Sequence, residues 1–540
     1  MTTALQSSLP PCVLHEDEHL LVVNKPAGWN THAPSPFAGE GIYDWLKHRE
    51  PRWANLAIIH RLDKETSGVM VFGKTPLANR SLTEQFARRT VRKQYLLLAD
   101  RQPKREEFIV RTQIARLGER YASCAHGEPA ETRFRFVATD AAGQHLVEAE
   151  PLTGRTHQIR VHAAEQGFPI IGDVLYGGVD SQRICLHAQK LTFQHPAGGQ
   201  QLAFEMPTDF STASRDDLRG AFIEAELTNA FRLTHGAGDG PQLKGWYADR
   251  LGDFLLSAIE GDLGSLQGAL EWWRKKHALR GVYRKELIRS VRQATSKESS
   301  ARLLLGDAAP ERFNIRENGV QFELSFNEGY SVGLFLDQRD NRRRLLTSHV
   351  AANFPLRESK IRNSKFEILN CFAYTCGFSV CAALAGARTT SLDLSKKYLE
   401  WGKRNFALNG LDSAAHEFIY GDAFDWLKRL AKKGRAFDGV ILDPPTFSQS
   451  KESGVFRVEK DFGKLVKLAL SVLKPGGVLF ASSNAADWPP ENFLVAVRGA
   501  VDAAGRRIAQ EHYVPQPPDF PISRAEPAYL KTVWLRVVEP

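Results

Sequence analysis

The pattern of apolar and polar positions changes character along the chain. Over residues 1–205, short apolar runs such as 20–23 and 95–99 lie between turn-forming residues, which predicts a mixed, mainly antiparallel sheet. From residue 365 onward, apolar runs of strand length alternate with amphipathic segments of helix length. The predicted strands are 366–369, 389–392, 439–442 and 478–481, and the predicted helices are 378–385, 396–408 and 462–473. This alternation predicts a parallel sheet with helices on both faces, a doubly wound α/β domain.

A chain of 540 residues is longer than one hydrophobic core usually organises, so several domains are expected. Residues 209–217 are polar and rich in Ser and Thr, which favours a linker at 211–226. We therefore predict a multidomain protein of α+β and α/β class. Its parts are a domain at 1–210, a small central α+β domain at 227–355 with a helix near 263–277, and the doubly wound domain at 356–540.

The composition is that of a globular protein, with 43% hydrophobic and 25% charged residues. No apolar run approaches the roughly 18–20 residues that span a bilayer, and the first residues lack a signal-peptide pattern, so a cytoplasmic location is expected. The six cysteines are scattered and form no Cys-x-x-Cys pair. Reduced thiols are therefore expected, and no metal site.

The chain carries a formal net charge of +9, and its basic residues are grouped. A group of basic residues is by default part of a solvated surface. Three such groups in one chain favour the interpretation that the protein binds a polyanion such as RNA. The groups are Arg88, Arg89, Arg92 and Lys93; Arg274, Lys275 and Lys276; and Arg339, Arg342, Arg343 and Arg344.

Asp63 is the first candidate for covalent chemistry. It follows the apolar run 56–59, so it falls where a strand gives way to a loop. A carboxylate held at such a place can act as a nucleophile on a nucleoside without a metal or a cofactor. The residues alone leave a second interpretation open, in which Asp63 only caps the following turn.

The nine residues 60–68, His-Arg-Leu-Asp-Lys-Glu-Thr-Ser-Gly, resemble the catalytic motif of the RluA-type pseudouridine synthases. Segments similar to the other motifs of that family occur in the family's order at 20–28, 93–95 and 153–162. On these motifs the first part of the chain is identified as a member of that family, and RNA is its expected partner.

The resemblance implies a role for several residues. Asp63 would attack the target uridine while the base is detached, rotated and rejoined through carbon, with no cofactor. Tyr95 would pack under the flipped base and assist proton removal, and Arg160 would pair with Asp63 and keep it ionised. Arg61 would fill the space that the uridine vacates, and Arg155 would contact the RNA.

Several members of this family carry a small RNA-binding domain before the catalytic one, whereas few residues precede the first predicted strand here. RNA affinity is therefore expected from elsewhere in the chain. We hypothesise that the C-terminal half supplies part of it.

A second candidate site lies in the α/β part of the chain. Residues 367–379 run from a strand into a helix, where backbone N–H groups can hold a nucleotide-like ligand. Asp393 ends the next strand, and Asp422 follows a later one; each is a candidate ligand contact or, alternatively, a cap or turn residue. Asp443, Pro444 and Pro445 end a further strand, a pattern typical of amino-group methyltransferases, which orient a flat base with such a loop.

Residues 228–233, 329–342 and the rest of the chain resemble the large-subunit ribosomal RNA methyltransferases of the RlmI and RlmK type. The resemblance implies a Rossmann-like domain, S-adenosylmethionine as the cofactor and RNA, foremost 23S ribosomal RNA, as the partner. The implied cofactor contacts are Gln338, Phe372, Thr375, Gly377, Asp393, Asp422 and Asp443, and the implied base contacts are Pro444, Pro445 and Phe447.

The cysteines bear on which atom receives the methyl group. Methylation of a pyrimidine carbon normally needs a thiolate near Pro444 or Ser482, and neither position has a cysteine nearby. Guanine nitrogen is therefore the predicted acceptor. Three alternatives stay open: a cytosine acceptor, tRNA in place of ribosomal RNA, and a chain in which only one half is catalytic and the other binds RNA.

Overall fold

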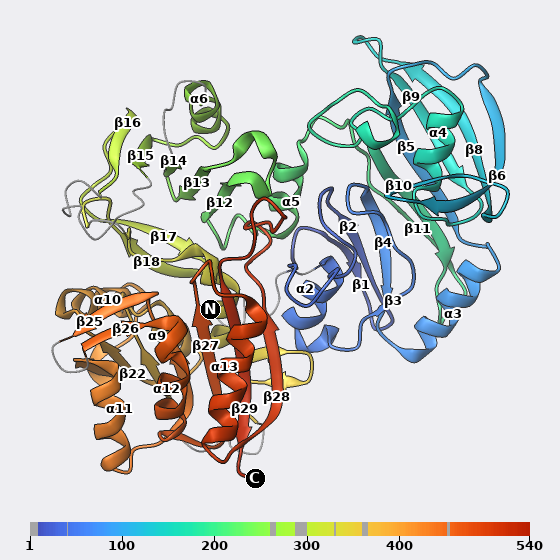
Figure 1. The fold of residues 1–540 in the computed structure, drawn as a ribbon. Helices are drawn as coiled ribbons and strands as arrows, with labels where there is room; N and C mark the ends of the chain where they lie inside the picture. Colours follow the sequence, from blue (N-terminus) through green and yellow to red (C-terminus); the bar gives the residue numbers. More distant parts are fainter. Residues whose placement is uncertain are drawn as a thin grey trace.

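The structure is a computed structural model that describes residues 9–39, 41–259, 266–286, 300–328, 331–358, 366–450 and 454–540. Figure 1 shows three parts: an N-terminal unit in blue and cyan, a central unit in green and yellow, and a C-terminal unit in orange and red. The predicted multidomain α+β and α/β class is confirmed.

An 11-stranded sheet forms the N-terminal unit, in the order β1-β2-β4-β10-β5-β9-β8-β6-β7, with β3 on β4 and β11 on β10. Among the described strands of this sheet, only β4 and β10 pair in parallel, so the sheet is mixed and mainly antiparallel as predicted. Its strands are β1 (Val13–Glu16), β2 (Leu20–Lys25), β3 (Ala57–Ile58), β4 (Ser67–Gly73), β5 (Arg92–Ala99), β6 (Glu107–Leu117), β7 (Arg120–Ser123), β8 (Glu128–Thr139), β9 (His145–Pro151), β10 (Leu186–Gln194) and β11 (Gln201–Glu205). Its helices are α2 (Ile42–Arg49), α3 (Pro76–Ala87) and α4 (Gln158–Glu165).

The segment 211–226, predicted as a linker, contains helix α5 (Ser214–Phe222). Leu218, Ala221 and Phe222 are buried on it in a core that includes residues of both neighbouring units. Their spacing of three and four residues places them on one helical face, a signal that the polar residues before them conceal. The linker prediction is wrong for this part of the segment, which is a packed element.

The central unit is built on a five-stranded sheet in the order β12-β13-β14-β15-β16. The predicted helix at 263–277 corresponds to α6, and residues 260–265 lie outside the described part. The elements here are β12 (Ala230–His235), β13 (Trp246–Leu251), β14 (Phe254–Ile259), α6 (Gln267–Lys276), β15 (Gly281–Glu286) and β16 (Arg302–Gly306), followed by the hairpin of β17 (Phe313–Glu317) and β18 (Val320–Leu324). Helix α8 (Arg339–Thr347) and the pair β19 (His349–Ala351) and β20 (Phe354–Pro355) lead into the last unit.

The C-terminal unit holds a seven-stranded sheet in the order β23-β22-β21-β24-β27-β29-β28, of which the first five strands are parallel. Ile368 of β21 packs into one core with α9 and α10, and its neighbour Leu369 packs into the other with α11, α12 and α13. Helices therefore cover both faces, as predicted. The elements are β21 (Glu367–Cys371), α9 (Gly377–Leu384), β22 (Arg388–Asp393), α10 (Lys396–Leu408), β23 (Glu417–Tyr420), α11 (Ala423–Lys432), β24 (Phe437–Leu442), β25 (Phe447–Ser450), β26 (Gly454–Arg457), α12 (Val458–Leu470), β27 (Leu473–Ser483), α13 (Pro490–Ala503), β28 (Arg507–Val514) and β29 (Lys531–Val538).

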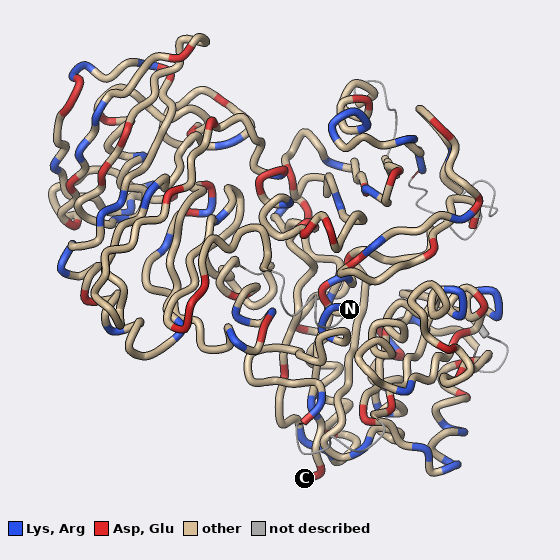
Figure 2. The backbone as a smooth tube through the Cα atoms, turned by 180° about the vertical axis from the view of Figure 1, so that it is seen from behind, with Lys and Arg blue, Asp and Glu red and all other residues tan. Residues whose placement is uncertain are grey.

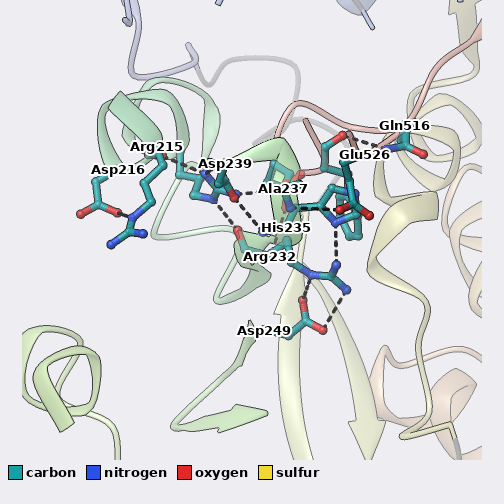
Figure 3. A network of polar contacts seen from close by, with 12 residues as sticks. Arg215, Asp216, Arg232, His235, Ala237, Asp239, Asp249, Gln516 and Glu526 are labelled. Carbon is teal, nitrogen blue, oxygen red and sulfur yellow. Dashed lines mark hydrogen bonds and ion pairs between the residues drawn. The ribbon is translucent and has the colours of Figure 1, made fainter. Parts of the chain in front are cut away.

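The loop between β28 and β29 ties the C-terminal unit to the central one. Figure 3 shows Arg232 of β12 between Asp249 and His235, with Glu526 of this loop close by. Glu526 accepts hydrogen bonds from the Tyr247 hydroxyl at 2.8 Å and from the Ala237 N–H at 3.0 Å. These contacts join segments almost 300 positions apart in the sequence.

The third basic group is buried and cannot serve as a solvated surface or an RNA contact. Arg339 binds Asp519 through two hydrogen bonds of 2.7 and 2.8 Å. Arg342 binds Glu317, Arg343 binds Glu50 and the carbonyl of Arg49 in the N-terminal unit, and Arg344 donates to the carbonyls of Val350 and Asp340. A buried guanidinium is costly unless it is paired or hydrogen-bonded, and the pairs of Arg339 and Arg343 join the central unit to its two neighbours.

The remaining charges are distributed over the molecule. Figure 2 shows blue and red segments interspersed along the backbone of all three units. The group at the end of α3 stays exposed at Arg88, Arg89 and Arg92, and that on α6 stays exposed at Lys275 and Lys276. Among the described helices, none combines the length and apolar character needed to cross a membrane.

Candidate active sites

A cavity of about 460 Å³ in the N-terminal unit brings the predicted catalytic residues together. It lies between the loop after β3, strand β5 and the start of α4. The candidate residues that line it are Asp63, Tyr95, Arg160, Arg61 and Arg155. The five come from three motifs that are separated in sequence (60–68, 93–95 and 153–162), and the fold brings them to one cavity.

The loop that carries Asp63 is pinned on both sides. The Thr31 hydroxyl donates to the carbonyl of Leu62 at 2.8 Å and accepts from its N–H at 3.2 Å. The buried Lys25 ammonium donates to the carbonyl of Lys64 at 3.0 Å, and burial lowers its pKa to about 7. A carboxylate between two such anchors is held at a defined place. The sequence shows the Lys25 segment as a motif but gives no sign of this function.

Arg160 lies within ion-pair distance of Asp63, its predicted partner, and also has a closer partner. It lies on α4 and forms two hydrogen bonds with the buried Asp173, at 2.6 and 2.8 Å. Its guanidinium nitrogen Nη1 lies 3.9 Å from Oδ2 of Asp63. Asp173 is thus the principal partner, and it fixes the guanidinium beside the Asp63 carboxylate. Asp173 is not among the residues predicted for this site.

Tyr95 and Lys93 project from β5 into the same cavity. Burial and, next, the negative charge of Asp63 raise the pKa of Tyr95 well above its usual value, so the side chain is a neutral phenol at physiological pH. Burial lowers the pKa of Lys93 to about 8, and its ammonium donates to the carbonyl of Thr153 at 3.1 Å. Lys93 lines the cavity, although the sequence indicates it only as part of a motif and of a basic group.

The two candidate RNA contacts are placed differently. Arg61 is exposed beside Asp63. Arg155 is partly buried, donates to the carbonyl of Pro129 at 3.1 Å and pairs with the exposed Glu128. The guanidinium of Arg155 is thus bound by protein partners, whereas that of Arg61 is accessible.

A second cavity, of about 320 Å³, opens at the carboxyl ends of β21, β22 and β24. Among its lining residues are Gln338, Phe372, Thr375, Gly377, Asp393, Asp443, Pro444 and Pro445. Two residues predicted for this site, Asp422 and Phe447, are not among those that line the cavity. The neighbours of Asp422, Gly421 and Ala423, do line it, and Phe447 is the first residue of β25.

The loop after β21 has an unusual backbone. Phe372, Tyr374 and Cys376 adopt the left-handed conformation, with φ of 62°, 48° and 63°. Non-glycine residues persist in this conformation only where their surroundings hold them, and such positions concentrate at ligand sites. One contact that holds this loop is the hydrogen bond that the Thr375 hydroxyl donates to the carbonyl of Gly333 at 2.6 Å.

The two acids after β22 and β23 serve different purposes. Asp393 accepts N–H bonds from Tyr374 and Ser395, both at 2.8 Å, while burial raises its pKa. Its carboxylate lines the cavity, as expected of a group that binds ribose hydroxyls. Asp422 caps α11 by accepting a hydrogen bond from the Asp425 N–H at 3.0 Å. This is the second of the two interpretations that the sequence left open for Asp422, a helix cap in place of a ligand contact.

Asp443 also lines the cavity and directly follows the last residue of β24. Its pKa is raised to about 6, mainly by burial and further by the negative charge of Asp337. Hydrogen bonds from Ser482 and Gln338 and the positive charge of Arg342 act in the opposite direction. The Gln338 amide donates to Asp443 Oδ1 at 3.2 Å and to Ser482 Oγ at 2.9 Å.

The cysteines of this unit are buried thiols. Burial raises the pKa of Cys376 to about 12 and that of Cys371 further still, so neither is a thiolate at physiological pH. All six cysteines of the chain are free, as expected for reduced thiols.

Comparison with known proteins assigns both cavities to families. Residues 19–165 match the RNA pseudouridylate synthase family, and residues 232–536 match the S-adenosylmethionine-dependent methyltransferase family. The ribosomal large subunit pseudouridine synthase C of Yersinia pestis is 38% identical over 219 residues, which are 38% of this chain and 67% of the relative. The ribosomal RNA large subunit methyltransferase I of Aeromonas salmonicida is 31% identical over 406 residues, which are 73% of this chain and 93% of the relative.

The chain belongs to both families. Its synthase domain holds the cavity around Asp63, and its methyltransferase domain holds the cavity around Asp393 and Asp443. Among solved structures, the methyltransferase SMU.776 in complex with SAH matches 64% of this chain and 87% of its own, with 28% identity and a TM-score of 0.51.

The methyltransferase cavity fits S-adenosylmethionine on its own chemistry. The Asp393 carboxylate suits ribose hydroxyls, and Phe372 to Thr375 of the loop after β21 line the same cavity. Phe335, Phe378 and Leu392 add apolar surface to its lining. When bound, the cofactor supplies an activated methyl group.

Proposed function

We propose that this protein is a bifunctional RNA-modifying enzyme that isomerises one uridine to pseudouridine and methylates one base, both in 23S ribosomal RNA. The observation that carries the proposal is that each domain assembles a separate cavity around its own acid. The two relatives described above, whose names place their activities on the large ribosomal subunit, support ribosomal RNA as the substrate.

In the synthase domain, Asp63 acts as the nucleophile toward the flipped uridine. Arg160, fixed by Asp173, stabilises the charge of the carboxylate from 3.9 Å. Arg61 and the exposed arginines at the end of α3 contact phosphates near the cavity mouth. Tyr95 packs under the base and takes part in proton removal once Asp63 has become covalently bound. Burial is the main cause of the raised pKa of the phenol, and esterification removes the second cause, the negative charge of Asp63.

Replacing Tyr95 with phenylalanine tests this order of events. The Tyr95→Phe variant keeps the aromatic surface but loses the hydroxyl, so pseudouridine formation is expected to fall by about 10²- to 10⁴-fold. A covalent RNA–protein adduct through Asp63 is expected to accumulate and to be visible on a denaturing gel. Tyr43→Phe, which removes a hydroxyl bonded to the carbonyl of Leu56, is the matched control with normal turnover. Normal turnover by Tyr95→Phe would contradict the role of the hydroxyl.

In the methyltransferase domain, the acceptor base lies against Pro444 and Pro445, and Asp443 accepts a hydrogen bond from the group to be methylated. Guanine nitrogen is the favoured acceptor, because Cys371 and Cys376 are buried thiols with raised pKa values and carbon methylation requires a thiolate. Ser482, which stands in place of a cysteine, bonds to Gln338 instead.

The proposal is tested by mapping modifications in RNA from a strain that lacks this protein. Mass spectrometry of ribosomal and transfer RNA is expected to show the loss of one pseudouridine and one methylguanine in 23S ribosomal RNA. Loss of marks only in tRNA would refute the ribosomal substrate, and loss of a methylcytosine would refute the guanine assignment.

A further inference from the structure

The methyltransferase domain contains a buried chain of hydrogen bonds that ends at Asp443. The Trp534 indole on β29 donates to Asn341 Oδ1 at 2.9 Å, and Asn341 Nδ2 donates to Gln338 Oε1 at 2.8 Å. Gln338 Nε2 then donates to Asp443 Oδ1 and to Ser482 Oγ, at 3.2 and 2.9 Å. All members other than Asp443 are 2% exposed or less.

The chemistry of the donors and acceptors allows this series of hydrogen bonds only one direction, from Trp534 toward Asp443. An indole N–H can donate but never accept, so Asn341 must turn its carbonyl toward Trp534 and its amino group toward Gln338. Gln338 must then turn its carbonyl toward Asn341, and both of its amide hydrogens face Asp443 and Ser482. A glutamine that spends both hydrogens on protein partners has none left for a cofactor.

We propose that Gln338 is a positioning residue: together with Asn341 and Trp534 it aims the Asp443 carboxylate at the acceptor base, rather than binding S-adenosylmethionine. This inference rests on the proposed function of the methyltransferase domain. Ser482 accepts from Gln338 and so turns its own hydrogen toward Asp443. Asp443 thus receives two donors on the protein side and keeps its remaining acceptor capacity for an N–H of the base.

The charged groups that face Asp443 are Asp337, just before α8, and Arg342, on α8; the latter is itself paired with Glu317. The acceptor site requires the ionised carboxylate, so methyl transfer rises with pH through the Asp443 pKa of about 6 and is constant above it. Loss of the Gln338 hydrogen bond disfavours the ionised form and moves this rise to higher pH.

The test compares the pH dependence of methyl transfer to RNA by the full-length protein and three variants, with S-adenosylmethionine binding measured alongside. Gln338→Leu is expected to shift the rise upward by about 1 pH unit, the equivalent of one hydrogen bond to a charged group, and to leave cofactor affinity within about threefold. Trp534→Phe, which keeps an aromatic ring but removes the N–H donor that orients the hydrogen-bond series, is expected to shift the rise less and in the same direction. Asn409→Leu removes a side-chain amide that bonds to the backbone of Gln321 and Asn405, and is expected to cause no shift.

An unshifted profile in Gln338→Leu would overturn the proposal, as would a loss of cofactor affinity without a shift. Should Gln338→Leu fail to fold, Trp534→Phe decides alone, since a shift supports the chain and an unshifted profile refutes it. A wild-type protein that transfers no methyl group to RNA would instead refute the proposed function, a result distinct from failure of the positioning role.

Discussion

Replacing Asp63 with asparagine is expected to reduce pseudouridine formation by about 10⁴-fold or more, because an amide cannot form the covalent bond that the carboxylate forms. The fold should survive the change. Arg160 keeps its two hydrogen bonds to Asp173, and the loop keeps its anchors to Thr31 and Lys25. The measurement is single-turnover conversion of uridine in ribosomal RNA.

Two controls separate catalysis from folding in this experiment. Asp140→Asn changes an exposed turn acid in the same domain and should leave both activities intact. The methyl transfer activity of Asp63→Asn itself should equal that of the wild type, since the two cavities are separate. Conversion by Asp63→Asn within tenfold of wild type would show that another group is the nucleophile.

Arg339→Leu is expected to destabilise the protein by about 3–5 kcal/mol, because it leaves the buried Asp519 carboxylate without its partner. Burial works against ionisation of Asp519, yet Arg339 holds the pKa of this acid below its usual value. Asp519 also accepts the N–H of Arg232 at 3.0 Å, so the loss should loosen the contact between the β28–β29 loop and the central unit. Urea denaturation followed by fluorescence measures the effect.

The double variant Arg339→Leu with Asp519→Asn supplies the control for this prediction. It removes the uncompensated charge but keeps an acceptor for the Arg232 N–H, so most of the lost stability should return. Arg88→Leu, at an exposed pair with Glu84, should change stability by less than about 0.5 kcal/mol. If Arg339→Leu is as mild as Arg88→Leu, the buried pair does not join the units.

The regular part of the fold and both catalytic regions are predictable from sequence because they rest on local patterns. Strand and helix alternation after residue 365 reports burial on both faces of a sheet, and β21, β22 and β24 appear within two residues of their predicted ends. Asp393 and Asp443 fall directly after apolar runs, and strand ends in one sheet meet at a common edge, while Asp63 follows the apolar run 56–59 after three residues. Helix α5 is missed because its apolar face is short and follows a polar stretch.

The contacts that define roles are less predictable, because they depend on partners distant in sequence. The arginines of α8 have the sequence pattern of an exposed basic helix. The carboxylates with which they form ion pairs belong to Glu50, Glu317 and Asp519. No local signal joins these positions. The partner of Arg160 is likewise determined by the loop that brings Asp173 to α4, and the orientation of Gln338 by an indole almost 200 positions away.

The central claim, that one chain carries two independent active sites, is tested most directly by complementation. A strain that lacks the protein is supplied with wild type, Asp63→Ala or Asp443→Ala, and its 23S ribosomal RNA is mapped by mass spectrometry. The account predicts that Asp63→Ala restores the methyl mark but not the pseudouridine, and that Asp443→Ala restores the pseudouridine but not the methyl mark. If either mark returns with the variant of its own site, or one folded variant loses both, the account is contradicted.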